Sequence, residues 1–257
     1  MGEKPGVLFL HGVRATHQIW DAQLAAVRAA GYAALAIDLP GHGVHAAPAG
    51  TGAGRPLSGI RGRPADESVN IEAGRFTLAS AYAEITNALA VLARPTALVG
   101  LSLGGYTALA YAAQHPDAPL VGIVAAGCAV EPKGKPVALY RGLAAVSNAG
   151  YHQTARTWRR LRHHPEPEPV VPWKLVTDAL GELAGHSTLA DIREIQLPIW
   201  FTNGSHDHLR FQAKHFAALA ADGAAVTIPD AGHNVNTDQP DAFSKVLLRA
   251  LTEFSAR

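Results

Sequence analysis

The residue with the clearest chemical potential is Ser102, which lies between an apolar run and a helical pattern in the stretch A-L-V-G-L-S-L-G-G-Y. Gly100, Gly104 and Gly105 surround it. A strand that turns sharply into a helix strains the backbone of the residue at the turn and crowds its neighbours, and glycines relieve that crowding. A serine on such a turn is suited to act as a nucleophile. A glycine-rich turn with an incidental serine is the alternative interpretation.

A serine hydroxyl is a poor nucleophile at neutral pH, so this chemistry requires a base that accepts its proton and an acid that orients the base. His233, in I-P-D-A-G-H-N, directly follows the last predicted strand, and Asp207, in F-T-N-G-S-H-D-H, follows the preceding one. Both candidates therefore fall on loops at the carboxyl ends of strands, where open α/β sheets bind their ligands. Thirteen histidines allow chance matches, but this joint order and placement is much harder to meet by accident.

Acyl transfer also requires hydrogen-bond donors for the oxyanion that develops on the substrate. One donor is the backbone N–H of Leu103, directly after the serine and at a helix N-terminus. The loop L-F-L-H-G-V-R after the first strand offers the other. Val13 is the expected donor there, because Gly12 allows the backbone to approach closely. A simple turn is the alternative interpretation of this loop.

Strands and helices must position these residues. Short apolar runs alternate with helical patterns along the chain, which favours a parallel sheet flanked by helices. Strands are expected at residues 7–10, 33–37, 97–99, 120–126, 199–202 and 225–228. Helices are expected at residues 20–30, 78–93, 103–114 and 241–254.

Two regions interrupt this alternation. Residues 44–74 are rich in Gly and Pro and weakly periodic, which predicts a mobile loop. Residues 129–193 hold helical patterns without a convincing strand, which indicates a helical insertion between two strands. We therefore expect a core of residues 1–128 and 194–257, and a cap of residues 129–193.

The composition limits the function classes. The chain has 257 residues and a formal net charge of +1, which gives no reason to expect nucleic acid or an anionic membrane as a partner. The single cysteine, Cys128, suits a reducing compartment, and the N-terminus does not resemble a signal peptide. No apolar run reaches the length of a membrane span. We expect a cytoplasmic protein that acts on a small molecule and carries no cofactor.

Five motifs in order resemble the α/β-hydrolase superfamily. They are L-H-G-V-R with a tryptophan downstream, I-D-L-P-G-H-G at 37–43, G-L-S-L-G-G at 100–105, N-G-S-H-D at 203–207 and A-G-H-N at 231–234. The resemblance implies a Ser102–Asp207–His233 triad, an oxyanion hole of Val13 and Leu103, and a helical cap. It also implies an α/β-hydrolase fold with a mostly parallel sheet. The stretch before the first motif is too short for the usual leading antiparallel strand pair.

Residue types narrow the chemistry within that superfamily. Haloalkane dehalogenases and epoxide hydrolases use an aspartate nucleophile and dienelactone hydrolases use a cysteine, whereas this chain offers Ser102. What remains is hydrolysis of a carboxylic ester, lactone or thioester through an acyl-enzyme. A metal is not expected, because His206 and His208 flank Asp207 at a spacing that suits no common closed zinc site.

Four residues are candidates for contact with substrate. Arg14, beside the oxyanion loop, could reach a substrate carboxylate or form a structural salt bridge. Tyr151 and Trp158 share a helical stripe in the insertion, and Tyr140 adds apolar bulk nearby in sequence. Part of this stripe would roof the acyl pocket, and packing on the core is the alternative.

Two other functions stay open on the same scaffold. A lyase, such as a hydroxynitrile lyase, would need a positive group near His233, and no lysine near the motifs makes one obvious. A hydrolase-like ligand receptor would keep the triad with negligible turnover. The serine esterase leads because all its catalytic parts are present. The acyl and alcohol parts of the substrate and the oligomeric state are left open.

Overall fold

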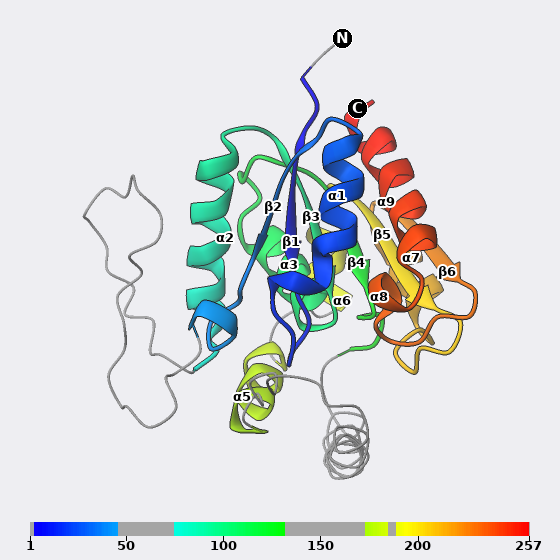
Figure 1. Ribbon diagram of the computed structural model, residues 1–257. Helices are drawn as coiled ribbons and strands as arrows, with labels where there is room; N and C mark the ends of the chain where they lie inside the picture. The colour runs from blue at the N-terminus through cyan, green and yellow to red at the C-terminus, as the bar shows by residue number, and fades with distance from the viewer. Residues whose placement is uncertain (1–2, 46–74, 132–172, 185–188, 257) are drawn as a thin grey trace, which may run out of the picture.

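The computed structural model describes residues 3–45, 75–131, 173–184 and 189–256. Within them, six strands form one sheet in which every neighbouring pair is parallel. The strands are β1 (Gly6–Leu10), β2 (Ala33–Ile37), β3 (Thr96–Leu101), β4 (Leu120–Ala126), β5 (Pro198–Gly204) and β6 (Asp222–Ile228). Their order is β2-β1-β3-β4-β5-β6, which confirms the predicted α/β-hydrolase fold with a parallel sheet (Figure 1).

Successive residues of a central strand face opposite layers, as the pleat of a strand requires. In β1, Leu8 and Leu10 pack into one hydrophobic cluster, while Val7 and Phe9 pack into the other. All four side chains are fully buried. Burial on both faces explains why this strand is a continuous apolar run rather than an alternating pattern.

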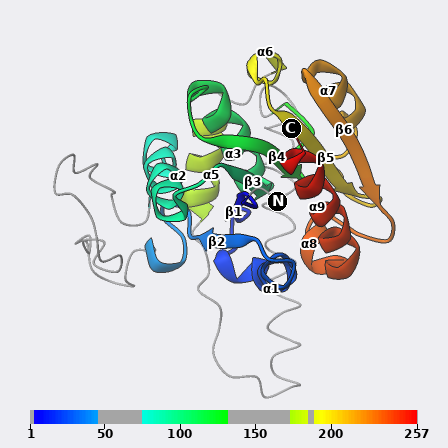
Figure 2. The same ribbon diagram turned by 90° about the horizontal axis from the view of Figure 1, so that it is seen from above.

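Helices cover both faces of the sheet (Figure 2). One layer holds the short 3-10 helix η1 (His17–Trp20) with α1 (Asp21–Ala29), α8 (Val235–Asp238) and α9 (Pro240–Ser255). The other layer holds α2 (Leu78–Leu92), α3 (Leu103–Gln114), α5 (Trp173–Leu183), α6 (Leu189–Glu194) and α7 (Ala213–Leu219). A second 3-10 helix, η2 (Gly43–His45), follows β2.

Local signals in the sequence set several of the helix ends. The hydroxyl oxygen of Thr77 accepts a hydrogen bond from the Ser80 N–H at 3.1 Å and caps the start of α2. That helix ends at Ala93, whose φ of 51° is left-handed, and Pro95 follows two residues later. Helix α9 begins with Pro240, which fits the first turn because the N–H it lacks would have no partner there.

The ends of the predicted strands and helices lie within three residues of the bounds in the structure. The strands at 33–37 and 120–126 and the helix at 103–114 have the predicted ends. Strand β6 starts three residues before the prediction, because most residues of this edge strand alternate between half-buried and exposed and form no apolar run. Helices α7 and α8 were not predicted, since both are too short to show a 3.6-residue period.

Only part of the predicted cap can be compared with the structure. Tyr140, Tyr151 and Trp158 lie outside the described residues, as do residues 46–74 of the predicted mobile loop. At the end of the insertion, α5 and α6 bury apolar side chains in the same hydrophobic cluster as α3. Glu182 of α5 accepts a hydrogen bond from the Leu78 N–H of α2 at 3.1 Å. Among the described helices, none is both long and apolar enough to cross a membrane.

Candidate active site

Ser102 lies at the turn between β3 and α3, as the sequence predicts. Its φ of 51° and ψ of −112° are strained for a residue with a side chain, and it is 8% exposed. A Cβ at Gly100 would overlap the backbone of Gly104, and a Cβ at Gly104 would overlap the backbone of Leu10. These glycines therefore let strand, turn and helix approach closely enough to present the serine at the carboxyl edge of the sheet.

Asp207 and His233 form a hydrogen bond, with 3.1 Å between Oδ1 of the carboxylate and Nδ1 of the imidazole. Asp207 follows β5 and is fully buried, while the side chain of His233, which follows β6, is 23% exposed. The carboxylate also accepts hydrogen bonds from Asn203 Nδ2 at 3.0 Å and from the Leu209 N–H at 2.9 Å. The site thus holds one buried anion with three donors around it.

Two opposing influences set the protonation of Asp207. Burial disfavours the charged form, but the hydrogen bond and charge of His233, followed by the donors of Leu209 and Asn203, outweigh it. The pKa of Asp207 therefore lies below its usual value. An ionised Asp207 accepts from Nδ1–H and leaves Nε2 of His233 as the basic nitrogen.

The sheet brings the serine and the histidine to neighbouring positions. The Ser102 N–H donates to the Ala126 carbonyl at 2.7 Å, so the serine lies beside the end of β4. Gly127, the next residue, has a φ of 61°. The imidazole ring of His233 packs against it, since a Cβ at Gly127 would lie 3.1 Å from Cε1 of His233. The three residues predicted as a triad thus lie at one edge of the sheet, the lower edge in Figure 1.

The loop after β1 runs directly past the serine. A Cβ at Gly12 would lie 3.6 Å from the Ser102 Cβ and 3.5 Å from the Leu101 carbonyl oxygen, so this backbone is in van der Waals range. Val13 follows and packs partly buried against the core. Leu103 begins α3, where backbone N–H groups have no partner within the helix. The two predicted oxyanion donors therefore belong to segments on either side of Ser102.

A buried histidine, His11, fixes this loop, for which a simple turn is the alternative interpretation of the sequence. His11 donates from Nδ1 to the Gly12 carbonyl at 2.8 Å and accepts at Nε2 from the Leu39 N–H at 2.9 Å. Burial, followed by the nearby imidazole of His42, lowers the pKa of His11 to about 3. His11 is therefore neutral at physiological pH and acts as a hydrogen-bonded connection between the end of β1 and the end of β2.

Two further residues near the predicted site residues in sequence are Arg14, a candidate for substrate contact, and His208. Arg14 is exposed on the same loop, and its φ of 70° is left-handed. His208 was discounted as a metal ligand, yet its ring centroid lies 5.3 Å from that of His233. Burial, followed by the charge of His233, lowers the pKa of His208. Within the described residues, no group of three or more His, Cys, Asp or Glu side chains is arranged to hold a metal ion.

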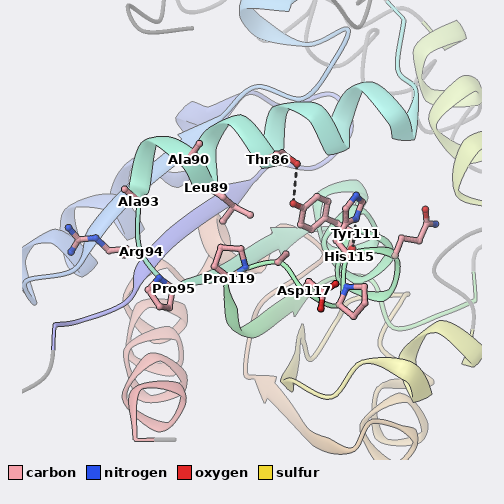
Figure 3. Close-up of a pocket in the computed structure, with 13 residues that line it drawn as sticks. Thr86, Leu89, Ala90, Ala93, Arg94, Pro95, Tyr111, His115, Asp117 and Pro119 are labelled. Atoms are coloured by element: carbon pink, nitrogen blue, oxygen red, sulfur yellow. Dashed lines mark hydrogen bonds between the residues drawn. The ribbon is translucent and has the colours of Figure 1, made fainter. Parts of the chain in front are cut away.

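A separate pocket of about 710 Å³ lies at the opposite edge of the sheet (Figure 3). It is bordered by α2, the end of α3 and the segments that lead into β3 and β4. The rings of Tyr111 and His115 stack there with centroids 4.2 Å apart, and Tyr111 Oη lies 3.1 Å from Thr86 Oγ1. No member of the predicted triad lines this pocket, so we place the candidate active site at the other edge.

Comparisons with known proteins agree with this architecture. The chain is 27% identical to an esterase of Mycobacterium tuberculosis, Rv0045c, across 96% of this chain and 82% of that protein. The enol-lactonase of Burkholderia xenovorans LB400 superposes with a TM-score of 0.68 at 19% identity, covering 98% of this chain and 92% of the other. A thermophilic esterase of Thermogutta terrifontis gives 0.68 at 20% identity, covering 99% and 92%.

A family model described as the alpha/beta hydrolase family matches residues 7–246, which run from β1 into the first half of α9 and include every residue of the predicted triad. This match covers far more than half of the chain. The protein therefore belongs to the alpha/beta hydrolase family.

Proposed function

We propose that this protein is a serine hydrolase that cleaves a carboxylic ester, lactone or thioester of a small molecule through an acyl-enzyme. The observation that carries the proposal is the Asp207–His233 hydrogen bond of 3.1 Å at the edge of the sheet where the strained Ser102 lies. A serine on a strained turn, an imidazole and a buried carboxylate hydrogen-bonded to one ring nitrogen are the parts that this reaction requires.

The relatives support the same reaction class. The curated relative is named an esterase, and the superposed structures include an enol-lactonase and an esterase. Esters and lactones share an acyl carbon bonded to an oxygen leaving group, so one site chemistry serves both. At these identities the choice among ester, lactone and thioester rests on the residues that contact the acyl and leaving groups.

The proposed reaction begins when Ser102 Oγ attacks the acyl carbon and its proton passes to Nε2 of His233. Asp207 holds the Nδ1–H and stabilises the resulting imidazolium. The carbonyl oxygen becomes an oxyanion, which accepts hydrogen bonds from the backbone N–H groups of Val13 and Leu103. The tetrahedral species collapses, and His233 gives the proton to the leaving alcohol or thiol. The acyl group stays on the serine oxygen.

Hydrolysis of the acyl-enzyme repeats these steps with water as the nucleophile. His233 takes a proton from water, the hydroxide attacks the acyl carbon, and the same two N–H groups stabilise the second oxyanion. Collapse returns the proton to Ser102 and releases the carboxylic acid. No redox step or additional reactant is required.

A cap over this edge is part of the proposal, with residues 129–193 inserted into a core of residues 1–128 and 194–257. Its support is the position of α5, beyond the carboxyl edge of the sheet in Figure 1. A Cβ at Gly41, on the loop after β2, would overlap the Leu175 side chain, so α5 packs against that loop. Substrate would enter between this segment and the loops that carry the triad.

The decisive test is covalent labelling with a fluorophosphonate, because an activated hydroxyl displaces fluoride from the phosphorus and keeps the phosphonyl group. We expect Ser102 to carry the label, and Ser102→Ala to lose the label together with about 10⁴-fold or more in kcat on p-nitrophenyl acetate. Ser255→Ala, which removes a hydroxyl in the last turn of α9, is the matched control and should keep both.

Each other outcome selects an alternative. Full esterase activity in Ser102→Ala would overturn the assignment of the nucleophile. Labelling of Ser102 without turnover on any ester or lactone would favour a ligand receptor. Release of cyanide from mandelonitrile would favour a lyase.

A further inference from the structure

The two segments that complete the candidate site continue into short helices that touch each other. The loop with Gly12 and Val13 continues into η1, and the loop with His233 continues into α8. One segment comes from the start of the chain and the other from its end, yet η1 and α8 are in contact. The relative position of the oxyanion loop and the imidazole therefore depends on how these two helices are joined.

Two buried amide side chains make that connection. Asn236 of α8 donates from Nδ2 to the Ile19 carbonyl of η1 at 2.8 Å. Gln23 of α1, the helix that follows η1, donates from Nε2 to the backbone carbonyl of Asn236 at 3.1 Å. Both side chains are fully buried, and both amides are oriented by donation to a carbonyl. These two hydrogen bonds therefore connect α8, which follows His233, to η1 and α1, which follow the predicted oxyanion loop.

The same two side chains are a poor choice for stability alone. The Oδ1 of Asn236 and the Oε1 of Gln23 are buried without a hydrogen-bond partner within the described part of the chain, as is Nε1 of the neighbouring Trp20. A buried polar atom without a partner destabilises the folded state, whereas an apolar side chain of similar size would not. The pair keeps a geometry at the expense of stability, which is typical of functional positions.

The rest of η1 is held firmly enough to transmit a displacement to the oxyanion loop. The N–H and the ring Nδ1 of His17 both contact Oδ1 of the buried Asp38, at 2.7 and 2.9 Å. The Ile19 N–H donates to the Thr16 carbonyl, and the Ala15 N–H donates to the Gly12 carbonyl. Residues 12–15 and 16–19 therefore each form a hydrogen-bonded turn, and these two turns connect η1 to the backbone beside Ser102.

We propose that Asn236, supported by Gln23, is a positioning residue that sets the distance between the His233 imidazole and the Val13 N–H on either side of Ser102. This inference rests on the proposed function. During attack the proton acceptor and the oxyanion donor must both be within hydrogen-bond reach of one tetrahedral centre. A misplacement of about 1 Å in such a site costs about 10²-fold in rate.

The test compares Asn236→Asp and Asn236→Ala with the wild type. The aspartate keeps the shape but presents an oxygen to the Ile19 carbonyl, and the alanine removes the contact. We expect both variants to lower kcat on p-nitrophenyl acetate by about 10- to 100-fold, with KM within about threefold. The rate of fluorophosphonate labelling should fall in parallel. The downfield proton signal of His233 Nδ1–H should shift or broaden, which reports on the site without turnover.

Two controls separate positioning from general destabilisation. Thr237→Val changes the next residue of α8, whose hydroxyl donates to the Asn234 carbonyl of the same turn, and should keep kcat and the proton signal. Leu247→Ala opens a cavity in the buried face of α9 and should lower the melting temperature at least as much as Asn236→Ala, with kcat unchanged.

The inference is overturned if the Asn236 variants keep the wild-type kcat and proton signal, or if Leu247→Ala lowers kcat equally. Both results leave Ser102 labelling in the wild type intact, so they are distinguishable from failure of the proposed function. A wild type that neither turns over nor labels would overturn the proposed function, and this inference with it.

Discussion

Among single residues, Asp207 is the one on which the electrostatics of the site depend. A fully buried carboxylate is ordinarily driven toward its neutral form, yet three donors keep this one ionised. In the proposed reaction this negative charge would stabilise the imidazolium of His233, because the carboxylate oxygen and Nδ1 of the imidazole lie 3.1 Å apart in a partly buried site.

Asp207→Asn should fold normally and lose about 10⁴-fold in kcat, because the asparagine amide favours the imidazole tautomer with the proton on the wrong nitrogen. Steady-state kinetics on p-nitrophenyl acetate and a circular dichroism spectrum provide the measurement. Asp230→Asn is the matched control, since residue 230 has a φ of 56° that asparagine adopts readily, and its rate should stay within threefold. A near-normal rate for Asp207→Asn would instead assign the acid to Asp230 or Asp238.

His11 makes the stability of the fold depend on pH. In the unfolded chain its pKa is near 6.5, while burial in the folded protein lowers that pKa to about 3. Between these values the unfolded state binds more protons, so the free energy of unfolding must fall as the pH falls. The contribution is fully present above pH 6.5 and is lost progressively toward pH 3.

Melting temperatures measured from pH 7.5 to pH 4 should therefore decrease steeply for the wild type and less steeply for His11→Gln, which has no group to protonate there. The slope should not vanish, because the lowered pKa values of His42 and Asp207 act in the same direction. His215→Gln, at an exposed position on α7, should keep the wild-type slope. An unchanged slope in His11→Gln would show that another group controls acid unfolding.

Among the elements, the junction of β3 with α3 leaves no space for side chains at two of its glycines. The helix approaches the end of β1 so closely that Gly104 has no space for a side chain against the Leu10 backbone. The contrasting case is Gly181, in α5, where no atom of the described residues lies within 4 Å of an added Cβ. The same substitution at these two helical glycines should therefore have opposite effects.

Gly104→Ala should abolish esterase activity and lower the melting temperature, because backbone must move to admit the methyl group. Gly181→Ala should keep the activity and stabilise the protein by about 0.4–1 kcal/mol, since alanine restricts the unfolded chain and favours helix. Thermal melts and ester kinetics on the two variants decide the matter. An active and stable Gly104→Ala protein would contradict the close packing of the turn.

The sequence predicts an element well when a strong periodic or turn signal coincides with burial. Three glycines marked the strand–serine–helix junction at Ser102. A run of β-branched and small apolar residues marked the strand at 120–126. Helix α7 and the start of β6 carried none, because a seven-residue helix and a half-exposed edge strand leave weak patterns. Asn203 was quoted only as part of a motif, since its bond to Asp207 is visible only in three dimensions.

Within the site, the reach of sequence reasoning ended at residues whose partners are distant along the chain. The triad could be ordered from strand ends, since each member follows its own strand. The connection from Asn236 to Ile19 could not be predicted, because 217 positions separate the two residues and no motif marks either. The role of His11 could not be predicted, because its burial between β1 and β2 depends on which strands are neighbours.

In the molecule as a whole, the ends of the chain meet. Helix α1 packs against α9, and both termini lie near the top of Figure 1. Trp20 links these ends to the sheet, with ring centroids 5.1 Å from Phe9 and 5.8 Å from Phe243. The layer that supports the oxyanion loop is therefore completed by the last helix.

This arrangement has a consequence for synthesis in the cell. Strand β1 pairs with β3 as well as with β2, and the imidazole of His233 and the helix that buries Trp20 are synthesised after all six described strands. Contacts between residues so far apart in sequence form slowly, after long loops have closed. A nascent chain therefore contains Ser102 well before His233 and α9 are made, and the proposed catalytic site can assemble only after these later residues have left the ribosome.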